Sequence, residues 1–166
     1  MTHTRYDLAR EIKQSLERQF PGFEVSVVDD AKTSGSFVGI VGVRGPGEIG
    51  SGGVAASAPV LCALVTDVPE TELNMLDWAG ELANHMLGRV KLALGPRARS
   101  LRASSPVVLP HASMAFTSTD TLYLFELRNG DHHFIAWFDL DLGDADPNTC
   151  AEEDPDGLPG QIILFD

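Results

Sequence analysis

Cysteine is scarce in this chain, which has only two among its 166 residues. Cys62 lies in an apolar run and Cys150 in an acidic one, so the pair predicts neither a disulfide framework nor a metal-binding knuckle. Two isolated cysteines fit a reducing compartment. We interpret Cys62 as a small buried hydrophobic residue and not as a nucleophile.

Positive charge is also scarce, because 12 basic residues face 24 acidic ones and the formal net charge is −12. A surface of this kind repels nucleic acid and anionic lipid, so we expect neither as a partner. The longest uncharged run, residues 49–66, is broken by glycine, serine and proline and does not predict a membrane span. Charged residues at positions 5, 7, 10, 11 and 13 interrupt any signal-peptide core. We therefore expect a soluble, cytoplasmic protein.

Length and composition suit one folded domain, with 43% hydrophobic residues available for its core. From residue 143 the chain becomes acidic and rich in proline and glycine. We therefore expect a single domain over residues 1–142, followed by an acidic tail over residues 143–166.

The spacing of apolar residues and turn signals predicts three helices, over residues 6–20, 57–65 and 69–94. Alternating patterns predict strands over residues 23–29, 36–43, 101–109, 113–118, 121–127 and 133–140. The Asn129-Gly130 pair between the last two predicts a hairpin. The order of elements predicts an α+β fold, with long helices packed on a largely antiparallel sheet.

The helix over residues 69–94 carries two opposite faces. At about 100° per residue, five positions fall within roughly an 80° arc and form a narrow polar ridge. The ridge consists of Asp77, Glu81, Asn84, Gly88 and Lys91. The opposite arc is apolar, so it should face the core. It consists of Met75, Ala79, Leu82, Met86, Val90 and Ala93.

A polar ridge is typical of any surface helix, so the residues alone favour a solvated face. Two features are nevertheless unfavourable for a purely structural helix. Asp77 and Glu81 are like charges four residues apart. Gly88 costs about 1 kcal/mol relative to alanine in a helix interior. Since both occur on one face, they also point toward function.

The stretch Asp77…Glu81-Leu-Ala-Asn84…Gly88…Lys91, followed by Ser105-Pro106-Val107-Val108, resembles the CheC/CheX family of chemotaxis phosphatases. The CheX branch is the more similar, because the chain has a single Glu-x-x-Asn copy. A glycine usually found shortly after the Pro-x-Val segment is replaced here by the region 109–111.

The resemblance implies a CheX-like fold and a phosphatase that dephosphorylates the phospho-aspartate of a response regulator. It implies that Asn84 positions the attacking water and that Glu81 pairs with a lysine of the regulator, while Asp77, Gly88 and Lys91 support or dock. No cofactor or metal is expected in this chain, and Mg²⁺ belongs to the receiver domain of the partner. A homodimer is also expected. The alternative is a non-catalytic module of the same fold that binds response regulators.

Other motifs are weaker. Residues 45–50 match Gly-x-Gly-x-x-Gly, but no helix follows at once, so nucleotide binding is disfavoured. The acidic residues between positions 139 and 148 lack the glycine and glutamate of a calcium loop. His132-His133 lacks a third metal ligand.

Overall fold

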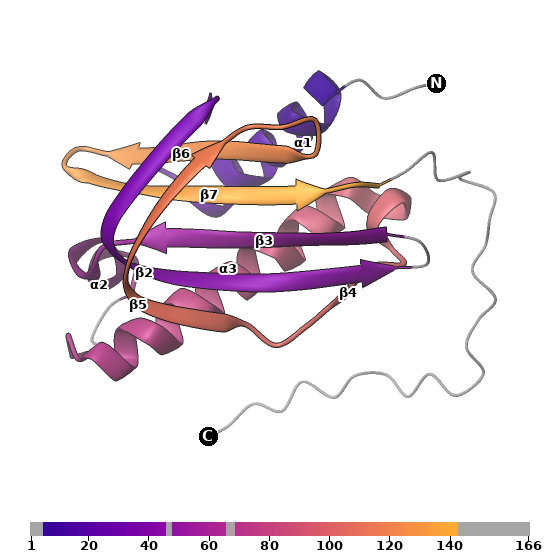
Figure 1. The fold of residues 1–166 in the computed structure, drawn as a ribbon. Helices are drawn as coiled ribbons and strands as arrows, with labels where there is room; N and C mark the ends of the chain where they lie inside the picture. The colour runs from indigo at the N-terminus through magenta and orange to yellow at the C-terminus, as the bar shows by residue number, and fades with distance from the viewer. Residues whose placement is uncertain (1–4, 46–47, 66–68, 143–166) are drawn as a thin grey trace.

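The computed structural model describes residues 5–45, 48–65 and 69–142. Its seven strands form one antiparallel sheet in the order β1-β6-β7-β3-β2-β4, with β5 also paired to β2 (Figure 1). The predicted α+β class is therefore confirmed. The strands are β1 Glu24–Val28, β2 Asp30–Gly45, β3 Glu48–Ala56, β4 Arg102–Ala103, β5 Val107–Thr117, β6 Leu122–Asn129 and β7 His132–Leu140.

Three helices cover one face of the sheet: α1 Arg5–Gln19, α2 Ala58–Leu64 and α3 Glu72–Leu94, which runs on into a 3-10 turn, η1 Gly95–Ala98. The helix α3 begins three residues later than Pro69, because the side chain of Thr71 accepts the backbone N–H of Asn74 at 3.2 Å. This is an N-terminal cap, which satisfies a backbone donor that the first turn leaves unpaired. No helix in the described part of the chain is both long and apolar enough to cross a membrane.

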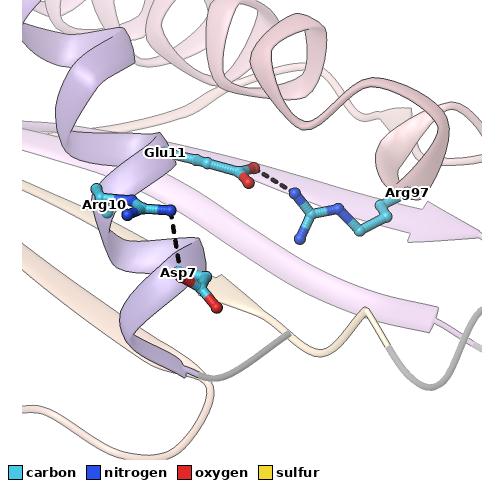
Figure 2. A network of polar contacts seen from close by, with 4 residues as sticks. All are labelled: Asp7, Arg10, Glu11 and Arg97. Carbon is cyan, nitrogen blue, oxygen red and sulfur yellow. Dashed lines mark hydrogen bonds and ion pairs between the residues drawn. The ribbon is translucent and has the colours of Figure 1, made fainter. Parts of the chain in front are cut away.

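The main core lies between the helices and the sheet. Ile12 and Leu16 of α1 and Val90 of α3 are fully buried there, against strand side chains such as Phe125. An ion pair between Glu11 of α1 and Arg97 of η1 joins the first helix to the end of the third, beside the Arg10–Asp7 pair at 3.2 Å within α1 (Figure 2). The shared core and the Glu11–Arg97 pair hold α1 against α3 and η1.

A smaller cluster covers the other face of the sheet, where the first part of β2 and the last part of β5 form a curved ribbon (Figure 1). Two β-bulges bend this ribbon: Ser34 and Gly35 of β2 face one residue of β5, and Pro110 and His111 of β5 face one residue of β2. The ring of Phe116 then lies 4.8 Å from that of Trp137. Strands β6 and β7 are therefore buried on both faces over much of their length, whereas β5 stays largely exposed.

The sequence did not predict β3, and it divided β5 in two. Gly50, Gly52 and Gly53 weaken the strand pattern of β3. Their small size is required, because a Cβ at Gly53 would lie 2.2 Å from the Trp137 ring. The strand β5 continues through Pro110 by means of its bulge. The predicted acidic tail, residues 143–166, lies outside the described residues.

Candidate functional site

The helix α3 lies against the sheet at two glycines. A Cβ at Gly39 of β2 would be 2.0 Å from the carbonyl oxygen of Ala79, so the backbones of strand and helix touch there. On the next residue of α3, a Cβ at Gly80 would be 3.0 Å from Val108 and 3.4 Å from Pro106 of the β5 side. The sheet therefore fixes α3 in place just before Glu81.

Four of the five ridge residues predicted from the sequence are exposed: Asp77, Glu81, Asn84 and Gly88. The opposite face of α3 is buried and differs slightly from the predicted stripe, because Leu82 and Ala93 are only half-buried. Its buried residues are Met75, Ala79, Gly80, Ala83, Met86, Leu87, Val90 and Leu94. The helix therefore turns one polar face to the outside, as its periodicity predicts.

Lys91 differs from the rest of the ridge. It is half-buried, and its Nζ donates to the carbonyl oxygen of Leu101. Burial, and then the positive charge of Arg102, lower the pKa of its ammonium group. The expectation of an exposed Lys91 was therefore wrong: this side chain joins α3 to the segment before β4.

Glu81 and Asn84 are the pair that the ridge brings together. Residues three apart in a helix have Cβ atoms about 5–6 Å from each other, on neighbouring turns of one face. Neither side chain makes a hydrogen bond or ion pair within the described part of the chain. A carboxylate and an amide are thus available side by side for a ligand outside the protein.

The exposed surface continues from Gly88 without obstruction. A Cβ built at Gly88 has no neighbouring atom within 4 Å, in contrast with Gly80. Another molecule could therefore approach the backbone of α3 closely one turn beyond Asn84.

A cavity of about 630 Å³ borders the ridge on one side. Glu81 lines its edge, together with Trp78, Leu82 and His85 of α3. The far walls come from the end of α1 and the loop after it, from the end of α2, and from the last residue of β6. Nine of the thirteen lining residues have apolar side chains. No motif in the sequence marks this cavity, because its walls come from elements distant in the chain.

No cluster of three or more histidine, cysteine, aspartate or glutamate side chains that could hold a metal occurs among residues 5–45, 48–65 and 69–142. In the Gly-x-Gly-x-x-Gly segment, Gly45 ends β2 and residues 48–50 begin β3, so the segment leads into a strand and not into the helix that a dinucleotide site requires. The acidic residues beyond position 142 lie outside the described residues.

No protein-family model and no curated protein matches the chain. Solved structures do match. A chemotaxis protein CheX from Desulfovibrio desulfuricans has a TM-score of 0.58 and 18% identity, over 81% of this chain and 96% of that one. A CheC-like superfamily protein from Shewanella sp. PV-4 has a TM-score of 0.61 and 16% identity, over 85% of this chain and 99% of that one.

A third similar structure is the CheX–CheY–BeF₃–Mg²⁺ complex from Borrelia burgdorferi, with a TM-score of 0.58 and 11% identity, over 82% of this chain and 97% of that one. At these identities the likeness establishes the fold. The helices, the antiparallel sheet and the near-complete coverage of the compared chains agree with the resemblance read from residues 77–109. The chain has the fold of the CheC/CheX chemotaxis proteins.

Proposed function

We propose that the protein is a phosphatase for the phospho-aspartate of a response regulator, with Glu81 and Asn84 as its working residues. The observation that carries this proposal is the exposed Glu81–Asn84 pair on a helix whose opposite face is buried. Both residues point away from the core on the part of α3 that Gly39 and Gly80 fix against the sheet. A rigid support of this kind is what precise positioning requires.

The reaction needs little else from the protein. Water attacks the phosphorus of the acyl phosphate, the bond from phosphorus to the aspartyl oxygen breaks, and carboxylate, inorganic phosphate and a proton result. The receiver domain supplies Mg²⁺ and a lysine near the phosphoryl oxygens. What remains is to hold a water in line with the phosphorus, so the contribution of the phosphatase is mainly positioning.

An asparagine amide is suited to that task. Its carbonyl oxygen accepts a hydrogen bond from the water, and its NH₂ can donate to a phosphoryl oxygen. It also brings no negative charge toward a phosphoryl group. Asn84 therefore holds the water in this proposal, while the carboxylate of Glu81 pairs with the lysine of the receiver and fixes the register of the two proteins.

The partner class is supported by the Borrelia burgdorferi CheX complex, in which a protein of this fold is bound to CheY with BeF₃ and Mg²⁺. The open space at Gly88 suits the close approach of another protein. Pairing of two copies of this chain through a sheet edge, expected from the sequence, stays a prediction that light scattering would check.

The test is the decay of phosphorylated receiver domains with and without this protein, across the receivers of its own genome. We expect one receiver to lose its phosphate faster in the presence of the protein, in a manner that requires Asn84. Binding without faster decay would instead identify a non-catalytic regulator-binding module. Absence of both binding and faster decay with every receiver would reject the whole proposal.

A further inference from the structure

The cavity beside the ridge is open to the same side as Glu81. Trp78, Leu82 and His85 lie three residues before, one after and four after Glu81 on α3, and all of them line it. Because positions three and four apart share a face, the edge of the cavity and the ridge form one continuous surface. A protein that docks on Glu81 can therefore reach this cavity as well.

The walls of the cavity are mainly apolar. Phe20 and Phe23 contribute aromatic rings that pack edge-to-face at 6.2 Å, and Leu61 and Leu64 of α2 lie on another side. The polar lining residues are Gln19, Glu81, His85 and Asn129, which are a minority of the thirteen. Binding in a recess of this composition is most favourable for an apolar group, because such a group removes the apolar walls from water.

We propose that the cavity receives a bulky apolar side chain from the response regulator and thereby selects which receiver domain docks on the ridge. The inference rests on the proposed function, since it assigns a role in recognition to a surface next to the catalytic pair. Protein interfaces commonly depend on a few large side chains inserted in pockets and surrounded by polar contacts. Here the ridge supplies the polar contacts and the cavity supplies the pocket.

This arrangement separates two tasks. Asn84 and Glu81 act on groups near the phosphoryl centre of any receiver, so they distinguish poorly between receivers. The cavity meets a side chain outside that centre, which can differ from one receiver to another. Discrimination between receivers therefore depends on the cavity, and the rate of the chemical step depends on the ridge.

Ala63 offers a test that spares the core. It lies in α2, it lines the cavity, and it is exposed, so a larger side chain there does not displace buried residues. Ala63→Glu and Ala63→Lys place opposite charges at the edge of the cavity. Ala115 of β5 is also exposed and does not line the cavity, so Ala115→Glu and Ala115→Lys repeat the same changes elsewhere.

The measurement is the dissociation constant of each variant for the beryllofluoride-activated, Mg²⁺-loaded receiver, followed by the decay rate at saturating protein. We expect both Ala63 variants to bind about 10- to 100-fold more weakly, since either charge opposes an apolar guest. The Ala115 variants should stay within about twofold of wild type, as rim charges have small effects. At saturation all four should retain the wild-type decay rate.

Three results would overturn the inference. Equal binding by the Ala63 and Ala115 variants would show that the cavity is not part of the interface. Opposite effects of Ala63→Glu and Ala63→Lys would indicate a charged guest. Tighter binding by both would indicate that another ligand competes for the cavity. If wild-type protein binds no receiver at all, the proposed function fails and the inference falls with it. That outcome differs from one in which wild-type protein binds a receiver and the Ala63 variants bind it equally tightly.

Discussion

Gly80 and Gly88 lie about two turns apart in α3, yet a side chain added to each would meet opposite surroundings. At Gly80 a Cβ would lie 3.0 Å from Val108 and 3.4 Å from Pro106, whereas at Gly88 nothing lies within 4 Å. The first glycine lets Pro106 and Val108 pack closely against α3. The second leaves an open place on the helix surface, which no other part of the described protein fills.

The residues between the two glycines share this division. Ala83, Met86 and Leu87 are buried in the core, and Glu81 and Asn84 are exposed. One face of a single helix therefore serves stability and the other is free for a partner. Substitutions on the two faces should separate folding from activity.

The largest effect on activity should come from Asn84→Ala. Loss of a positioned hydrogen-bonding group typically costs about 10²–10³ in rate, by analogy with oxyanion-hole residues. The free energy of unfolding should change little because Asn84 is exposed. The measurement is receiver-phosphate decay at saturating protein, where weak docking no longer limits the rate.

Asp77→Ala is the matched control, since it removes another exposed polar residue of the same ridge and should reduce the rate much less. Glu81→Ala should fall between the two, partly through weaker docking. If the receiver loses its phosphate as fast with Asn84→Ala as with wild type, the water-positioning role is wrong. Glu81 and Asn84 would then be a docking pair.

On the buried face, Gly39→Ala should cost about 3 kcal/mol of stability, at the upper end for overpacking a core. The added methyl would collide with the backbone at Ala79, which cannot rotate away as a side chain can. Gly42→Ala in the same strand is the control, because its Cβ would meet only the Ser104 side chain, at 3.2 Å. Urea denaturation measures both. Equal midpoints for the two variants would mean that α3 does not depend on this contact.

The ridge could be predicted from the sequence because helical periodicity is a local property. The separation of Asp77, Glu81 and Asn84 from Met86 and Val90 follows from 100° per residue, and it needs no knowledge of the fold. The hairpin at Asn129-Gly130 was equally local, and the structure confirms a turn between β6 and β7. Gly130 has a φ of 57°, which glycine adopts without strain.

The cavity and the glycine-rich strand could not be predicted in this way. Gly52 and Gly53 oppose a strand assignment locally. Their close neighbours, which include Phe138 and Trp137 of β7, explain why glycine is needed there. The prediction that Lys91 is exposed was wrong for the same reason, since its hydrogen-bond partner Leu101 is ten residues away. In each case tertiary contacts override the structure that the local sequence pattern favours.

Substitutions at Gly88 test whether the open surface of α3 contacts a partner. Gly88→Ala should raise the free energy of unfolding by about 0.5–1 kcal/mol, because alanine favours the helix and the added methyl meets no neighbour. Gly88→Phe should leave the fold intact but weaken receiver binding by filling the approach to the ridge. Chemical denaturation and binding to the activated receiver measure the two effects. Unchanged binding by the phenylalanine variant would show that the partner does not cover Gly88.

The smallest expected effect on receiver binding concerns Lys91. Its angle on the helix places it in the ridge, but its hydrogen bond joins α3 to Leu101. Lys91→Met should cost about 1 kcal/mol of stability, because the variant loses the donor to Leu101 while it keeps a long side chain. Arg89→Met removes the same charge from an exposed position of the same helix, so it should leave stability nearly unchanged. Both variants should bind the receiver with similar affinity if Lys91 only holds α3 to the segment before β4. If Lys91→Met instead weakens receiver binding more than Arg89→Met does, without a loss of stability, then Lys91 leaves Leu101 to contact the partner, and the exposed ridge extends one turn beyond Gly88.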